Sequence, residues 1–300
     1  MKKGGYIIIV LVAVFLLSFL ASKIIDSDTN VIQDQIVIIP IKGVISSSSS
    51  SGLFEETNVG IDSVLNELKK AKQDSSIKAV VLDINSPGGT VVASREIANA
   101  VKNLDKPVVA VINEVGASGA YWVASSADVI IANELSITGS IGVISSYLQF
   151  SDLMDKYGVK YEQLTAGQYK DLGSQFKDLK QDEKIILQSK LNKVHEIFLN
   201  EVTERRNITD IRKVSTGEFF LGIEAKELGL IDKFGNRDAA IEEAKKLANS
   251  NSPRIVEFKE KRSLFDLLGQ VSAKSFYFLG KGIGSEIKLD TENNYKLEAI

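Results

Sequence analysis

The sequence predicts an α/β protein with a layered core, in which strands and helices alternate around a mainly parallel sheet. Apolar runs of strand length, such as 77–85 (IKAVVLDIN), alternate with stretches of helical periodicity, such as 59–73. This alternation is typical of parallel sheets that are covered by helices. The run at 77–85 is apolar at nearly every position, as expected for a strand that is buried on both faces.

The remaining elements follow the same pattern along the chain. Strands are expected at 35–43, 77–85, 107–112, 128–133, 140–145 and 161–167, and helices at 59–73, 90–104, 118–127, 181–206 and 237–249. The serine run at 46–52 cannot bury apolar area and therefore predicts a mobile loop.

The composition excludes several function classes. A formal charge of −3 over 300 residues provides no basic surface, so nucleic acid is not an expected partner. The chain has no cysteine, which rules out disulfides, thiolate metal sites and a cysteine nucleophile. Its single histidine, His195, disfavours a zinc site built on imidazoles. We therefore expect no metal site built on cysteine or histidine ligands.

The N-terminal region has the features of a membrane anchor. Residues 4–22 carry no charge and would form a helix of about 28 Å, close to the roughly 30 Å of a hydrocarbon core. A cleaved signal peptide is the alternative, but no small-x-small cleavage site is found near Ala21. Lys2 and Lys3 precede the apolar run, which places the N-terminus in the cytoplasm and the body of the protein outside it.

The expected organisation has four parts. Residues 1–25 form the single-pass anchor, 26–52 a polar linker with the first strand, and 53–250 the α/β domain. Residues 251–300 form a C-terminal extension that is partly disordered, because its last 20 residues are polar.

Two glycine-bearing turns stand where strands end and helices begin. In INSPGGTV (84–91), Gly88 and Gly89 open a helix, and in VGASGAY (115–121), Ser118 lies at a helix N-terminus. Glycines leave the backbone N–H groups free to face a ligand, and ligands of such sheets bind beyond the carboxyl ends of strands. Two adjacent turns can each offer one N–H to an oxyanion. Taken singly, however, each is equally an ordinary tight turn or N-cap.

If Ser118 is a nucleophile, it needs a base. The G-x-S-x-G spacing of α/β-hydrolases is not met, since Gly119 follows the serine directly. His195 lies on a long amphipathic helix with no paired carboxylate evident, which is typical of a packing or surface residue. Lys170, in LTAGQYKDLGSQF (164–176), is the other candidate. A lysine acts as a base only when burial lowers its pKa from about 10.4 toward 7 to 8, and most lysines are solvated.

The chain resembles the signal peptide peptidase A family of membrane-bound Ser-Lys peptidases over about residues 35–250. The resemblance rests on GASG at 116–119, TGSIGV at 138–143 and the G-x-Y-K-D-x-G-S run at 167–174. Glu114, where aspartate is expected, and Thr90, where serine is common, are minor departures. The chain holds a single copy of the domain, like the short members of the family.

This resemblance implies a ClpP/crotonase-like fold for the domain at 53–250 and roles for five residues. Ser118 would be the nucleophile and Lys170 the general base, while Gly89 and Gly119 would supply the oxyanion-hole N–H groups. Ser140 matches the serine that hydrogen-bonds the catalytic lysine.

The resemblance also implies the reaction and the partners. It implies a serine endopeptidase that cleaves residual signal peptides through an acyl-enzyme, without a cofactor. It further implies a homo-oligomeric ring at the cell membrane, in which neighbouring subunits complete each other's sites.

Three alternatives are weighed against this hypothesis. A crotonase-type acyl-CoA enzyme would share the fold and the paired N–H groups without needing Ser118 or Lys170. A non-catalytic membrane scaffold would need neither residue. A Ser-His-Asp peptidase is disfavoured because SITGSIGVISSY (136–147), after Ser118, contains no histidine.

Overall fold

The structure is a computed structural model that describes residues 12–17, 33–47 and 59–258. Its strands are β1 (Gln35–Lys42), β2 (Ile45–Ser46), β3 (Val59–Gly60), β4 (Ile77–Ser86), β5 (Val108–Ala117), β6 (Val129–Ala132), β7 (Ile137–Gly139), β8 (Phe219–Leu221), β9 (Lys233–Phe234) and β10 (Arg254–Glu257). Its helices are α2 (Ile61–Gln73), α3 (Val91–Lys102), α4 (Gly119–Ser125), α5 (Ser151–Lys156), α6 (Gln181–Thr203), α7 (Ile211–Val214), α8 (Gly222–Glu227) and α9 (Arg237–Leu247).

The central sheet has the strand order β10-β1-β4-β5-β6-β9, and all of these neighbours pair in parallel. The predicted α/β class and the mainly parallel sheet are thus confirmed. A short strand, β7, pairs in parallel with the end of β5 and antiparallel with β8. β10 adds an edge strand from a segment that the sequence places in the C-terminal extension. The two strands that lead to the glycine turns are β4 and β5. Because they pair in parallel, both turns lie at the same edge of the sheet.

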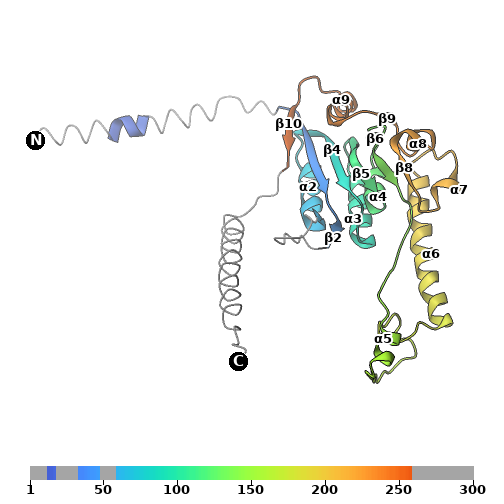
Figure 1. The fold of residues 1–300 in the computed structure, drawn as a ribbon. Helices are drawn as coiled ribbons and strands as arrows, with labels where there is room; N and C mark the ends of the chain where they lie inside the picture. Colours follow the sequence, from blue (N-terminus) through green and yellow to red (C-terminus); the bar gives the residue numbers. More distant parts are fainter. Residues whose placement is uncertain (1–11, 18–32, 48–58, 259–300) are drawn as a thin grey trace, which may run out of the picture.

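Helices cover both faces of the sheet, as parallel strands require. Figure 1 shows α9 on one side of the sheet and α2, α3 and α4 on the other. The α9 face buries a compact apolar layer, formed by Ile36, Ile38, Ala79, Val81, Val109, Val111, Ile131, Ala240 and Ala244. The larger core lies on the opposite face, where α4 is buried along its whole length. This burial makes α4 a rigid support for the residue that precedes it, Ser118.

Two predicted strands are wrong. The strand expected at 140–145 ends earlier, at Gly139, because Gly139 and Ser140 have φ values of 77° and 51°. Two successive left-handed residues turn the chain out of the sheet. The segment at 161–167 is also no strand, because each of its residues is exposed and it pairs with none of the described strands. The strand predicted at 161–167 therefore does not form.

Residues 143–180, which we call the arm, leave the sheet and return to it through α6. Figure 1 shows α5 and its surroundings at the end of α6 that is distant from the sheet. The arm has internal contacts, including a hydrogen bond from the Phe150 N–H to the Gln175 carbonyl (2.7 Å) and a ring contact between Tyr161 and Phe176 (4.9 Å). Many of its large apolar side chains are nevertheless exposed: Ile144, Leu148, Leu153, Tyr157, Val159, Tyr161, Leu164, Tyr169 and Phe176.

The expected anchor, 1–25, lies outside the described residues except for a helical stretch at 12–17. Within the part of the chain that the structure describes, no helix is both long and apolar enough to cross a bilayer. The serine loop expected at 46–52 and the end of the C-terminal extension also lie mostly outside this part.

Candidate active site

Ser118 stands in a strained turn between β5 and α4. Its φ of 52° and ψ of −125° lie outside the regions that L-residues favour, at a cost of about 1–3 kcal/mol. The surrounding backbone enforces this conformation. The Ser118 N–H donates to the Gly139 carbonyl (2.9 Å), and the Ser118 carbonyl accepts from the Trp122 N–H (3.0 Å). Strain that is held in place in this way is typical of functional residues.

The second glycine turn lies directly beside the first. The Ile45 N–H donates to the Gly88 carbonyl (2.8 Å), and the Thr90 N–H donates to the Ile45 carbonyl (2.9 Å). Because these two bonds face Ile45, the N–H of the intervening Gly89 points to the other side of its strand. A Cβ at Gly89 would lie 1.8 Å from the Ile45 carbonyl oxygen. Only glycine therefore fits at this position.

Two free backbone N–H groups meet next to Ser118. The Gly89 nitrogen lies 3.3 Å from the point that a Cβ of residue 119 would occupy. Among the described residues, neither the Gly89 N–H nor the Gly119 N–H has an acceptor. Gly119 is the first residue of α4, where N–H groups have no partner within the helix. The pair can stabilise a negative oxygen that forms on a carbonyl attached to Ser118.

Ser140 approaches the same site from β7. In the pairing of β5 with β7, Ala117 is opposite Gly139, so Ser118 and Ser140 are the next residues of the two chains. Ser140 is half-buried, and its N–H donates to the Glu218 carbonyl (2.9 Å). The structure thus brings together four of the five residues predicted from the sequence: Ser118, Ser140, Gly89 and Gly119.

His195 is a half-buried residue on α6, and its Nε2 lies 3.1 Å from the carbonyl oxygen of Ile141. None of the described carboxylates is hydrogen-bonded to its ring. This is the packing position expected for His195, and the arrangement lacks the acid that orients the histidine of a triad.

Lys170 lies apart from the other four residues. It is exposed in a turn of the arm, where its N–H donates to the Gly167 carbonyl (3.2 Å). Figure 1 shows that the arm extends away from the sheet and from α4, the helix that follows Ser118. Within the described residues, the Lys170 amine takes part in no hydrogen bond or ion pair. A single folded chain therefore presents Lys170 to the outside.

Asp171, the carboxylate next to Lys170 in the chain, forms an ion pair with another lysine, Lys177. Lys177 forms ion pairs with Asp171 (2.7 Å) and with the buried Glu183 (2.6 Å). The hydrogen bonds from Lys177 lower the pKa of Asp171 and of Glu183, and the same bonds raise the pKa of Lys177. The ion pair with Lys177 partly neutralises the negative charge of Asp171, which is the residue next to Lys170 in the chain.

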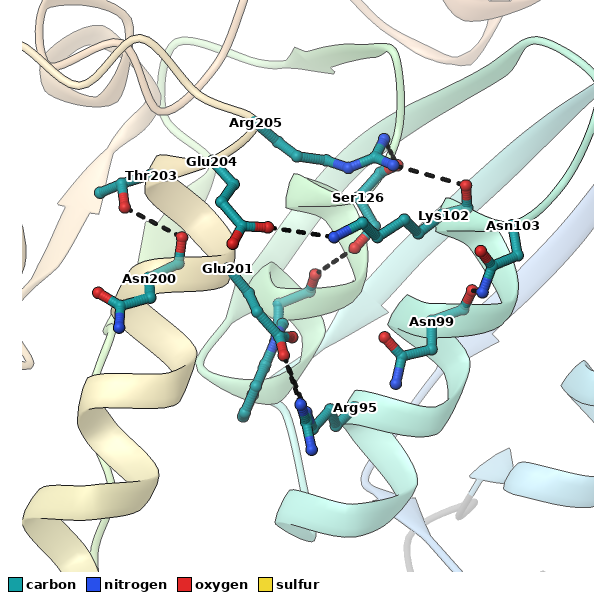
Figure 2. Close-up of polar contacts among 11 residues, drawn as sticks. Arg95, Asn99, Lys102, Asn103, Ser126, Asn200, Glu201, Thr203, Glu204 and Arg205 are labelled. Carbon is teal, nitrogen blue, oxygen red and sulfur yellow. Dashed lines mark hydrogen bonds and ion pairs between the residues drawn. The ribbon is translucent and has the colours of Figure 1, made fainter.

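Sequence reasoning missed the contacts that connect α6 to the helices next to the site. Glu201 accepts hydrogen bonds from Arg95 of α3 (2.7 and 2.9 Å) and from the Trp122 indole of α4 (2.8 Å). Trp122 also stacks on Phe198 at 4.3 Å. Figure 2 shows these side chains of α6 and α3 turned toward one another, with a further pair between Lys102 and Glu204. The partners are up to 106 residues apart, so no local pattern reveals them. They join the helix that carries the arm to the helices that follow Gly89 and Ser118.

The fold and this site correspond to a known class of enzyme. The model of the Clp protease family matches residues 53–133, which include both glycine turns. The molecule is thus a serine peptidase with a ClpP-like α/β core. The model of Peptidase family S49 matches residues 100–251, and the chain belongs to this family.

Individual relatives agree with this assignment. The chain is 37% identical to a putative protease of Methanocaldococcus jannaschii, over 80% of this chain and 76% of that protein. It is 33% identical to a putative signal peptide peptidase SppA of Enterococcus faecium, over 75% and 67%. Protease 4 of Haemophilus influenzae is 32% identical over 75% of this chain, which spans 37% of that longer protein.

A solved structure shares the fold. It is a mutant form of the 1510-N membrane-bound stomatin-specific protease, with a TM-score of 0.52 and 13% identity. The match covers 76% of this chain and 99% of that one. This likeness concerns the fold, whereas the match to Peptidase family S49 and the relatives named as proteases favour a serine peptidase over the acyl-CoA enzyme and the non-catalytic scaffold.

Proposed function

We propose that this serine peptidase is a membrane-anchored endopeptidase that cleaves residual signal peptides with a Ser-Lys dyad. The observation that carries the proposal is the strained Ser118 beside two N–H groups that have no acceptor among the described residues. The name of the Enterococcus faecium relative supports the substrate class. The single histidine, which is bound to a backbone carbonyl, supports a lysine as the base.

The proposed reaction has two steps. The Ser118 Oγ attacks the peptide carbonyl carbon while the neutral amine of Lys170 takes its proton, and the carbonyl oxygen becomes an oxyanion held by the N–H groups of Gly89 and Gly119. The C–N bond then breaks, and the lysine returns the proton to the leaving amine. In the second step, water attacks the acyl-enzyme with the same lysine as base, which releases the acid and restores Ser118. Ser140 would hold the lysine by a hydrogen bond. The reaction needs neither a metal nor a cofactor.

The base in this proposal comes from a second copy of the chain. The arm exposes Lys170 together with a set of large apolar side chains, including Leu164, Tyr161 and Tyr169. Apolar surface of this kind marks an interaction site. Each subunit of a homo-oligomeric ring would place its arm against the sheet edge of the next, so that one serine and a neighbouring lysine complete each site. Parallel membrane tethers favour such cyclic symmetry.

The anchor in this proposal is the N-terminal segment, 1–25. The described part of it, residues 12–17, is helical, and Val12, Val14, Phe15, Leu16 and Leu17 are each more than half exposed. We place the N-terminus in the cytoplasm and the peptidase domain outside the cell membrane. A tether of this kind raises the local concentration of enzyme near apolar peptides that stay in the bilayer.

The test uses the full chain in detergent micelles. A fluorescent fluorophosphonate should label the wild type and should not label Ser118→Ala, because labelling requires an activated serine. The wild type should also cleave a synthetic signal peptide within its apolar core, and Ser118→Ala should not. Labelling without cleavage of this peptide would reject the substrate class, and a wild type that is neither labelled nor active would reject the site.

A further inference from the structure

Ser94 is a buried serine on α3 whose hydroxyl has no hydrogen-bond partner among the described residues. Its side chain is completely buried, and its Oγ is one of only two buried side-chain polar atoms without a partner in the described part of the chain. An unpartnered buried hydroxyl destabilises a fold, so each such group calls for an explanation. Positions that break a packing rule in this way tend to be functional.

The hydroxyl lies against the backbone that forms the proposed oxyanion hole. The Ser94 Oγ is 2.2 Å, and its Cβ 2.8 Å, from the point that a Cβ of residue 119 would occupy. The Gly89 nitrogen lies 3.3 Å from the same point. Ser94 thus occupies the space that a side chain at position 119 would need. It lies near the start of α3, the helix that follows Gly89.

Ser94 does not touch the substrate. Its Oγ is closed to a sphere the size of a water molecule, and a carbonyl oxygen is no smaller than that. An oxyanion between the two N–H groups therefore contacts Gly89 and Gly119 but not Ser94. Any effect of Ser94 on the reaction has to pass through the position of Gly119.

We infer that Ser94 is a positioning residue for the oxyanion hole, which holds the Gly119 peptide so that its N–H and that of Gly89 point to one site. This inference rests on the proposed function, in which these two N–H groups bind the oxyanion. Alanine at 94 would leave a gap of one atom behind Gly119. The Gly119 N–H could then shift away from the direction in which the oxyanion forms.

The expected effect is on the transition state alone. Ser94→Ala should lower kcat about three- to tenfold, a part of the 10²- to 10³-fold that the loss of a whole oxyanion donor costs. KM should stay within about twofold, because the ground-state carbonyl depends little on the hole. The unfolding midpoint should be unchanged or higher, since the variant removes an unpartnered hydroxyl.

Ser125→Ala is the matched control. Ser125 is a serine of α4 that is 1% exposed, but its Oγ donates to the Trp122 carbonyl (2.8 Å). Its loss should lower the unfolding midpoint and leave kcat unchanged. We therefore expect Ser94→Ala to lose turnover but not stability, and Ser125→Ala to lose stability but not turnover. A general packing defect would not produce this contrast.

The experiment compares the full-length wild type, Ser94→Ala and Ser125→Ala in micelles. Fluorophosphonate titration counts competent sites, so that kcat is expressed per labelled Ser118. A peptide aldehyde, whose adduct with Ser118 places an oxygen in the hole, should bind Ser94→Ala more weakly by the same factor as kcat falls. This readout reports on the hole and does not respond to general destabilisation.

Two results would overturn the inference. If Ser94→Ala retains wild-type kcat per site and aldehyde affinity, Ser94 does not position the hole, and the proposed peptidase stands. If its activity falls only in proportion to labelled sites, with a lower unfolding midpoint, the role is structural. A wild type that is neither labelled nor active would instead reject the proposed function itself.

Discussion

Ser118 and Ser140 occupy equivalent positions at the ends of two paired strands, and both have left-handed backbones. Ala117 of β5 pairs with Gly139 of β7, and the serines that follow have φ values of 52° and 51°. Each conformation is held by a hydrogen bond from the serine N–H, to Gly139 in one case and to Glu218 in the other. The backbones of the two serines thus lie side by side, and each is held by hydrogen bonds within the fold.

Substitution of Ser140 should separate stability from activity. Ser140→Ala and Ser140→Gly should both lower kcat about tenfold, the value of one hydrogen bond to the base. Ser140→Gly should have the higher unfolding midpoint of the two, because a left-handed backbone costs a residue with a Cβ about 1–2 kcal/mol. Calorimetry and peptide cleavage would measure both effects. Wild-type turnover in either variant would remove Ser140 from the site.

Replacement of the base should stop the reaction without unfolding the protein. Lys170→Ala should abolish peptide cleavage and leave the circular dichroism spectrum unchanged, because the side chain is exposed. His195→Ala should keep at least half of the activity, since within the described residues its ring is hydrogen-bonded only to the Ile141 carbonyl. A well-folded but inactive His195→Ala protein would argue against a Ser-Lys dyad.

The pH profile distinguishes an amine base from an imidazole. An amine accepts a proton only when it is neutral, so kcat/KM should keep rising into alkaline buffer. A histidine base would reach its plateau a unit or more lower. Rates measured from pH 5.5 to 10 with a chemistry-limited substrate test this expectation. A profile that is already flat between pH 6 and 7 is incompatible with the proposed base.

Mixed oligomers test whether neighbouring subunits share a site. Inactive Ser118→Ala and Lys170→Ala chains should regain activity when they assemble together in equal amounts. Random mixing leaves about one junction in four with both groups intact, so recovery near a quarter of wild-type activity is expected. Mass spectrometry would verify the mixing. Mixed assemblies without any recovered activity would mean that each chain builds its own dyad.

Acid should loosen the arm before it unfolds the core. The pKa values of Asp171 and Glu183 are lowered by their bonds to Lys177, so these bonds stabilise the fold above the ordinary carboxylate range near pH 4. Their contribution is lost as the pH falls through the lowered pKa values and both groups take up protons.

Hydrogen exchange at pH 3 and pH 6, corrected for intrinsic rates, should show selective loss of protection near residues 171–183. In Lys177→Met, the same segment should already be less protected at pH 6. Equal protection at both pH values would show that these pairs do not hold the arm.

The alternating core and the two glycine turns can be predicted from the amino-acid sequence. Continuous apolar runs such as the one at 77–85 require a strand that is covered on both faces, and this became β4. The turns at Gly89 and Ser118 follow from local chain chemistry, because glycine opens backbone conformations that place N–H groups at a strand end. Such features depend on neighbours within a few residues, so they can be read without the fold.

The position of the arm, and the contacts around the proposed oxyanion hole, depend on the tertiary structure. The sequence at 161–167 was expected to form a strand, but a strand forms only where a partner offers its hydrogen bonds, and the folded chain leaves every residue of this segment exposed. Ser94 looks like any helical serine until α3 packs on α4 and its Oγ meets Gly119. Glu201 likewise acquires Arg95 and Trp122 only through packing. These relationships join residues that are 25 to 106 positions apart, as from Ser94 to Gly119 and from Arg95 to Glu201. Their energies arise from contacts that exist only once the layers are assembled, so no local periodicity encodes them.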